Sequence, residues 1–272
     1  MTLSQQTPSG IAFDRSGPPH ESPIVLVHAG VADRRMWDPQ WDELTATRDS
    51  IRLDLRGFGE STTPPPSGAL NHTADLLETL DHLQISRWHL VGSSLGAGVA
   101  TEAAITRPHS TRSLLLCTPG GSLLAEMTAD LRLFIDAEES ALARDDLDAA
   151  VEANVISWIV GRERHSSDVD PTVLQAVRAM QRHAFSVAKQ LGDIGEVEMD
   201  PPALDRLDEL TTPTRVLVGG HDMATTHDSA QRVSAGARRV ERVDWDDVAH
   251  LPSMEQPARF SALLLEWVRS HD

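Results

Sequence analysis

The residues best suited to chemistry lie in the segment Gly92-Ser93-Ser94-Leu95-Gly96. An apolar, β-type run precedes it at Trp88 to Val91, and a small-residue helical stretch follows it at Ala97 to Ile105. Ser94 is therefore predicted to lie on a sharp strand-to-helix turn, with its side chain above the carboxyl end of a parallel sheet. The small residues on both sides suit a turn that leaves no room for bulk. A serine in this position is a candidate nucleophile.

A serine hydroxyl is a weak nucleophile at neutral pH, so Ser94 needs a general base, and the base needs an orienting carboxylate. Asp222 follows the apolar run Arg215 to Gly219, and His250 follows the last such run. Each therefore lies just past a different predicted strand. The order along the chain, serine, then aspartate, then histidine, is one that is known for such triads. We predict Ser94, Asp222 and His250 as the catalytic residues.

Other histidines and aspartates are weaker candidates. His28 is expected to hydrogen-bond within its own loop, and most other histidines, His72 and His89 among them, are expected to be solvated on helix faces or in loops. Asp228 is expected to begin the helix after Asp222. Three further aspartates lie too close to His250 along the chain to orient it from behind: Asp244, Asp246 and Asp247.

Attack on a carbonyl also requires donors for the oxyanion, usually two backbone amides. The residue after the nucleophile, Leu95, is predicted to supply one. The loop after the strand Ile24 to Val27 is predicted to supply the other, through Gly30 or alternatively Val31. We expect no metal and no cofactor.

Apolar runs bounded by turn residues recur along the chain and are typical of strands buried on both faces. These runs are Ile24 to His28, Ser50 to Leu55, Trp88 to Gly92, Ser113 to Cys117, Arg215 to Gly219 and Arg238 to Val243. Helical patterns lie between them, at Met36 to Thr45, Asn71 to Leu83, Leu95 to Thr106 and Glu255 to His271. This alternation predicts an α/β fold with a mostly parallel, doubly wound sheet, whose strands end at one edge.

The interval from the strand ending near Cys117 to the strand starting near Arg215 has no strand signal. Helical segments are expected at 128–144 and 145–160, with a third helix from Pro171 to about Leu191 capped by Asp170. We predict a core of residues 1–118 and 213–272, with residues 119–212 as a helical cap and its connection. The residues expected to line a pocket are Val31, Phe134, Trp158, Met180, Phe185 and Leu251. The alternative is that the cap residues among them only pack the cap helices together.

Composition limits the possible partners and the compartment. The formal net charge of -17 makes nucleic acid and anionic membrane surfaces poor partners, so a neutral or weakly polar small molecule is the expected substrate. Cys117 is the only cysteine, and the segment from Met1 to Gly17 is polar, with no apolar leader-like stretch. Both features favour the cytoplasm.

Together these motifs resemble the α/β-hydrolase superfamily. The segments that carry the resemblance are Val27–Gly30, Trp37, Asp54–Ser61, Gly92–Gly96, Gly219–Asp222, His250–Pro252 and Glu255–Pro257. In length and motifs the chain is most similar to the bacterial carboxylesterase and 3-oxoadipate enol-lactone hydrolase-like branch, which includes acyl-homoserine lactonases. Ala29 and Ala97 depart from glycines that are usual in the family. The resemblance implies a cofactor-free serine hydrolase, and a serine at position 94 argues against the dehalogenases and epoxide hydrolases, which carry aspartate there.

The expected function is hydrolysis of small esters or lactones through an acyl-enzyme. One alternative uses the same triad to cleave carbon–carbon bonds of dienoates, with Arg178 or Arg182 binding the substrate carboxylate. Another is a ligand receptor with little turnover. The sequence leaves the particular substrate, the acyl-chain length and the oligomeric state open.

Overall fold

The computed structural model describes residues 4–197 and 199–272, so the first three residues of the predicted core and residue 198 of the predicted cap lie outside the described part. The strands are β1 (Gln5–Gln6), β2 (Ala12–Ser16), β3 (Ile24–Val27), β4 (Ser50–Leu53), β5 (Trp88–Ser93), β6 (Thr111–Cys117), β7 (Thr214–Gly219) and β8 (Val240–Trp245). Within the described residues they form one eight-stranded sheet in the order β1-β2-β4-β3-β5-β6-β7-β8. The strands from β3 to β8 are parallel, and β1 and β2 join antiparallel at one edge.

The predicted α/β class is confirmed, and each apolar run predicted as a strand is one. The edge pair β1 and β2 was not predicted. Its longer member, β2, is a short strand that contains Asp14 and Arg15, so it lacks the uninterrupted apolar run typical of a strand in the middle of a parallel sheet.

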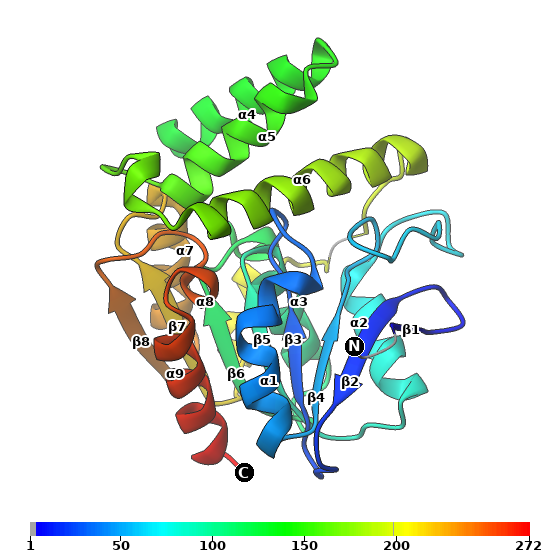
Figure 1. Ribbon diagram of the computed structural model, residues 1–272. Coiled ribbons are helices and arrows are strands. Elements are labelled where there is room, and N and C mark those ends of the chain that lie inside the picture. Colours follow the sequence, from blue (N-terminus) through cyan, green and yellow to red (C-terminus); the bar gives the residue numbers. More distant parts are fainter. Residues whose placement is uncertain (1–3, 198) are drawn as a thin grey trace.

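Helices cover both faces of the sheet (Figure 1). Their bounds are η1 (Arg34–Trp37), α1 (Asp38–Thr47), α2 (His72–His82), α3 (Leu95–Thr106), η2 (Gly121–Leu123), η5 (Ala203–Glu209), α7 (Ala224–Gly236), α8 (Pro252–Glu255) and α9 (Pro257–Arg269). On one face α1 and α9 pack on strand residues such as Leu26 and Leu115, and on the other α2, α3 and α7 pack on Val25 and Leu114. Helix α7 begins at Ala224, so the expectation that Asp228 begins it is wrong.

A second group of helices lies over the carboxyl ends of the strands (Figure 1). It comprises α4 (Ala129–Ala143), α5 (Leu147–Asn154), the π-helical turn η3 (Val155–Val160), η4 (Ser166–Asp168) and α6 (Pro171–Leu191). Asp170 caps α6 as predicted, because its side chain accepts a hydrogen bond from the Thr172 amide at 2.8 Å. The segment η5 instead contacts α3 and α7 of the core layer. The domain boundaries at 118 and 213 stay a prediction.

None of the helices in the described part of the chain is both long and apolar enough to cross a lipid bilayer.

The turn between β5 and α3 brings backbone segments into close contact. Ser94 has φ 53° and ψ −115°, a conformation that L-residues rarely adopt. A Cβ at Gly92 would lie 2.2 Å from Gly96 O, and a Cβ at Gly96 would lie 2.4 Å from Val27 O. Both glycines are therefore required for α3 to pack against β3 and β5.

We expect Gly96→Ala to lower the free energy of unfolding by about 1–3 kcal/mol or more, because the added methyl meets backbone atoms that cannot rotate away. Urea denaturation measures the difference. The control is Gly195→Ala, since a Cβ at Gly195 meets no atom within 4 Å. Equal stability of both variants would contradict the close approach.

Two histidines expected to be solvated are buried. His72 at the start of α2 is 7% exposed, and His89 in β5 is fully buried. The ring of His89 hydrogen-bonds to Ser113 Oγ at 2.8 Å. Burial lowers the pKa of each histidine to about 4, because a charged ring would lose its hydration.

These lowered pKa values make the protein less stable as the pH falls from 6.5 to 5, because the unfolded chain then binds protons that the folded chain excludes. One such histidine lowers the free energy of unfolding by about 1–2 kcal/mol between pH 6.5 and pH 5. We expect His89→Asn to reduce the loss by that amount in urea denaturation at the two pH values. His109→Asn, at an exposed position, is expected to keep the wild-type dependence.

Candidate active site

Ser94 lies at the carboxyl end of β5 and is held there by backbone contacts to the segment after β6. Its amide donates to Cys117 O at 2.9 Å, and the Gly120 amide donates to Ser94 O at 3.2 Å. Ser94 is partly exposed and lines the cavity described below. A serine with this backbone conformation presents its hydroxyl to the cavity, as the sequence predicted.

Asp222 and His250 form a buried pair after β7 and β8. His250 Nδ1 lies 2.7 Å from Asp222 Oδ2, and the two side chains are 2% and 0% exposed. Asp222 Oδ1 accepts from the Met223 amide at 2.7 Å and from Thr226 Oγ1 at 3.1 Å. These contacts fix the carboxylate, which in turn fixes the orientation and tautomer of the imidazole.

The loop that carries His250 is tied to both the core and the helices above it. Thr118 Oγ1 donates to His250 O at 2.9 Å, and the His250 amide donates to Trp158 O at 3.2 Å. The ring of Trp158 packs on the imidazole with centroids 4.4 Å apart. Sequence reasoning placed Trp158 in the pocket but missed this contact, because no local pattern links positions 158 and 250.

A buried ion pair supports the same loop from behind. Glu255 accepts from the Ala249 amide at 2.8 Å and from Arg164 Nη1 at 2.7 Å. Burial raises the pKa of the Glu255 carboxyl, and Arg164 opposes this shift. Arg164 also donates to Ile159 O at 2.8 Å and to Val160 O at 2.7 Å. Sequence reasoning singled out the segment Glu255–Pro257 but missed this pair, because 91 residues separate Arg164 from Glu255 along the chain.

The segment after β6 connects the serine to the histidine. Cys117 O holds the Ser94 amide, and the next residue, Thr118, holds the His250 carbonyl. The three predicted catalytic residues therefore lie at one edge of the sheet. Within residues 4–197 and 199–272, no hydrogen bond joins Ser94 Oγ to the His250 ring.

The two predicted oxyanion donors face one cavity. Gly30 and Leu95 both line it, and a Cβ at Gly30 would lie 3.6 Å from Leu95 Cβ. Among the described residues, the amides of Gly30, Val31 and Leu95 have no hydrogen-bond acceptor. The choice between Gly30 and Val31 therefore stays open.

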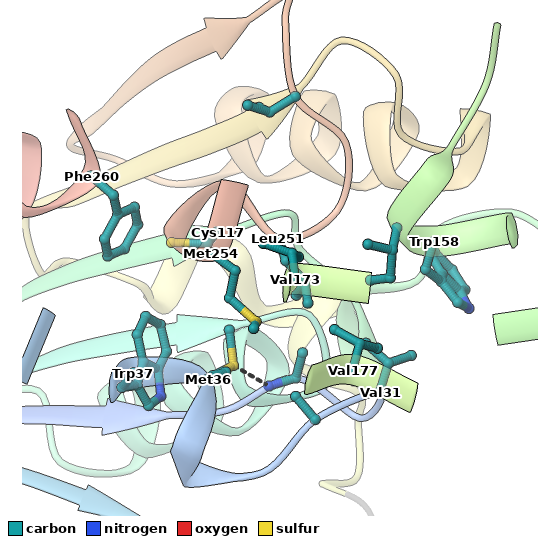
Figure 2. Packing of buried hydrophobic residues seen from close by; sticks show 14 of the residues in the cluster. Val31, Met36, Trp37, Cys117, Trp158, Val173, Val177, Leu251, Met254 and Phe260 are labelled. Carbon is teal, nitrogen blue, oxygen red and sulfur yellow. Dashed lines mark hydrogen bonds between the residues drawn. The ribbon is translucent and has the colours of Figure 1, made fainter. Parts of the chain in front are cut away.

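His28 and Met36 shape the loop that contains Gly30. The His28 ring contacts Ala29 O through Nδ1 at 2.8 Å, and Nε2 accepts from the Leu55 amide at 2.9 Å. Burial lowers the pKa of His28, so it stays neutral and structural, as expected. Met36 Sδ accepts from the Ala29 amide at 3.3 Å, which is the dashed line in Figure 2.

The cavity beside Ser94 has a volume of about 510 Å³. Of the predicted pocket residues, Val31, Phe134, Trp158 and Phe185 line it. Met180 and Leu251 do not line it and are buried in the hydrophobic core instead.

These two corrections have packing causes. On α6 the cavity-lining residues recur at helical spacing, at Gln181, Ala184, Phe185 and Ala188. Met180 lies one turn before Ala184 on α6 and is buried in the same hydrophobic cluster as Val173 and Val177. Leu251 belongs to the same buried cluster as these two valines (Figure 2).

Polar residues that sequence reasoning missed also line the cavity: Arg56, His72, Glu138, Asn154, Gln181 and Glu196. Arg56 is fully buried and pairs with Asp75 through contacts of 2.6 and 2.9 Å. It belongs to the segment Asp54–Ser61, so the motif could have pointed to it. No sequence pattern indicated that polar residues of the cap helices line the cavity, because polar residues on helices are usually exposed to solvent.

Arg178 and Arg182, the cations required by the carbon–carbon alternative, are not among the residues that line the cavity. Arg178 pairs with Glu152 and Arg182 pairs with Asp148. In the described part of the chain, no three His, Cys, Asp or Glu side chains are grouped so that they could hold a metal ion.

Comparison with curated proteins finds distant relatives. The chain is 27% identical over 255 residues to the dihydrolipoyllysine-residue acetyltransferase component of an acetoin cleaving system from Pseudomonas putida, covering 92% of this chain and 64% of that protein. The chain thus spans less than two thirds of that relative's length. It is 22% identical over 255 residues to 3-oxoadipate enol-lactonase 1 of Acinetobacter baylyi, covering 94% of this chain and 91% of that one.

A thermophilic esterase from Thermogutta terrifontis, solved with malate bound, has a similar structure. It superposes with a TM-score of 0.76 at 25% identity and covers 100% of both chains. The alpha/beta hydrolase family matches residues 24–263, which include the turn at Ser94, Asp222 and His250. The chain therefore belongs to the alpha/beta hydrolase family.

Proposed function

We propose that this protein is a serine hydrolase that cleaves esters or lactones of small molecules through an acyl-enzyme. The observation that carries the proposal is the buried Asp222–His250 pair, 2.7 Å apart, at the sheet edge where Ser94 lies on a strained turn. The chain belongs to the alpha/beta hydrolase family, and the similar proteins reported above include an enol-lactonase and an esterase.

In the proposed mechanism His250 Nε2 takes the proton from Ser94 Oγ as that oxygen attacks the substrate carbonyl. The Asp222 carboxylate stabilises the imidazolium that results. The amides of Leu95 and of Gly30 or Val31 donate to the oxyanion. His250 then protonates the leaving alkoxide, and the acyl group stays on Ser94.

Water completes the cycle. His250 removes a proton from a water molecule as its oxygen attacks the acyl-enzyme, and it returns that proton to Ser94 Oγ as the acid leaves. A lactone has its alcohol tethered to the acyl group, so both products of ring opening are one molecule. The cavity of about 510 Å³ beside Ser94 is within the volume range of small-molecule sites.

Carbon–carbon bond hydrolysis finds less support, because both arginines proposed to bind the substrate carboxylate pair with carboxylates outside the cavity lining. A receptor with little turnover predicts tight binding and near-zero hydrolysis across esters and lactones. A panel of p-nitrophenyl esters, acyl-homoserine lactones and enol-lactones separates it from the proposed enzyme.

Replacing Ser94 by alanine removes the attacking oxygen and is expected to abolish nearly all turnover of activated esters, by about 10³-fold or more. Steady-state hydrolysis of a p-nitrophenyl ester measures the loss. The control is Ser186→Ala at a half-buried position of α6 that does not line the cavity, and we expect this variant to hydrolyse the ester at the wild-type rate. Wild-type turnover in the Ser94 variant would refute the mechanism.

Asp222→Asn keeps the size of the side chain but removes the charge that stabilises the imidazolium. We expect kcat to fall by about 10⁴-fold, with the fold unchanged by circular dichroism. Asp228→Asn removes the same charge from an exposed position of α7 and is expected to leave kcat unchanged. Similar rates for the two variants would remove Asp222 from the mechanism.

A further inference from the structure

A chain of contacts leads from the histidine of the proposed triad into the helical cap. The ring of Trp158 packs on His250 at 4.4 Å, and Phe134 meets Trp158 edge to face at 5.3 Å. One turn after Phe134 on α4 comes Glu138, whose Oε1 accepts from Asn154 Nδ2 of α5 at 2.5 Å. Two aromatic rings thus lie between His250 and the helical turn of Glu138 in this series of contacts, and Glu138 lines the same cavity as Ser94.

Glu138 is a partly buried carboxylate without a countercharge. Among the described residues, no arginine, lysine or histidine forms an ion pair with it. Burial raises the pKa of Glu138, and the hydrogen bond from Asn154 only partly opposes this effect. A carboxylate held in such surroundings gains from any cation that enters the cavity.

A second unsatisfied group lies on α6. Gln181 is 5% exposed and lines the cavity, and its Oε1 is buried with no hydrogen-bond partner in the part of the chain that the structure describes. Buried polar atoms normally have partners, and a carboxamide oxygen accepts N–H or O–H groups. A ligand group with several donors would satisfy Gln181 and Glu138 together.

Aromatic rings complete the surroundings. Phe58, Phe134, Trp158 and Phe185 all line the cavity. The faces of such rings attract cations, most strongly where water is excluded. Aromatic rings also pack well against hydrocarbon, so they suit a ligand in which a hydrocarbon chain joins the reacting carbonyl to a distal charged group.

The remaining charged groups of the cavity do not oppose a cation. Arg56 is neutralised by Asp75, and the pKa of His72 is lowered to about 4, so its ring is uncharged at neutral pH. Glu196 adds a second carboxylate to the lining. The whole chain carries a formal net charge of -17, which favours the approach of cations.

We propose that this cavity selects esters or lactones that carry a protonated amine several carbons from the scissile carbonyl, with the ammonium bound by Glu138 and Gln181. The inference rests on the proposed ester or lactone hydrolysis, and it names the substrate class of that same site. An ammonium has three N–H donors, enough to serve both a carboxylate and a carboxamide oxygen.

The test compares p-nitrophenyl esters of equal size that differ only in their last group. These are heptanoate, 6-hydroxyhexanoate and 6-aminohexanoate, with nonanoate and 8-aminooctanoate as a longer pair. For at least one of the two acyl-chain lengths, we expect wild-type kcat/KM to be about tenfold or more higher for the amine-terminated ester than for the methyl-terminated ester. Hydrogen bonds to charged groups contribute on this scale.

The variant Glu138→Gln keeps the shape of the side chain and removes its charge, so the ratio of amine to methyl kcat/KM is expected to fall to about one. The matched control is Glu139→Gln, which removes the same charge from the neighbouring, exposed position of α4. We expect it to keep the wild-type ratio, because it does not line the cavity.

Binding without turnover gives an independent measurement. Titration calorimetry compares hexylammonium with 1-hexanol on the Ser94→Ala protein and on Ser94→Ala combined with Glu138→Gln. Tighter binding of the ammonium, lost in the double variant, supports the inference even if no tested ester is hydrolysed.

Each outcome has a distinct meaning. Hydrolysis of all esters at equal kcat/KM, with equal binding of amine and alcohol, would overturn the amine preference and leave the proposed function intact. If kcat/KM for 6-hydroxyhexanoate exceeded that for heptanoate by as much as kcat/KM for 6-aminohexanoate does, the role of charge would be overturned. Hydrogen bonding would then be sufficient to explain the preference. No hydrolysis of any ester, with ammonium binding retained, would refute the proposed function and keep the cation site.

Discussion

The close approach of backbone at Gly92 and Gly96 is the constraint on which the rest of the site depends. It lets α3 start directly after β5, so that Ser94 must adopt a conformation with positive φ. Such a conformation costs about 1–3 kcal/mol, and it persists because β5 is fixed between β3 and β6 in the middle of the sheet. The sheet thus holds the serine in place and aims it at the cavity.

The second half of the site depends on contacts between the core and the cap helices. The His250 loop is held by Thr118 from below, by the backbone and ring of Trp158 from above, and by Glu255 with Arg164 from behind. Both the core and the cap helices therefore contact His250. Trp158 has two roles, because it packs on the His250 ring and also lines the cavity.

The core and the cap helices contribute different kinds of groups to the cavity. The core supplies the serine, the paired histidine and aspartate, and free backbone amides, which suit acyl transfer on any ester. The cap helices supply aromatic rings together with Glu138 and Gln181, the groups that we propose for substrate recognition. This division is consistent with one fold serving many substrates, because specificity then changes with cap side chains while the reacting groups stay fixed.

The sequence by itself determined the features that depend on local patterns. Buried strands, the turn at Ser94 and the Asp170 cap of α6 follow from apolar runs, glycine spacing and capping residues that act over a few positions. Only the tertiary structure decided which cap residues face the cavity. It placed Gln181 at the cavity and Met180 in the core, and it buried His72 and His89. Among the described residues it also left Glu138 without an ion-pair partner. The physical reason is that the facing of a side chain depends on how several helices pack together, and no periodicity within one helix contains that information.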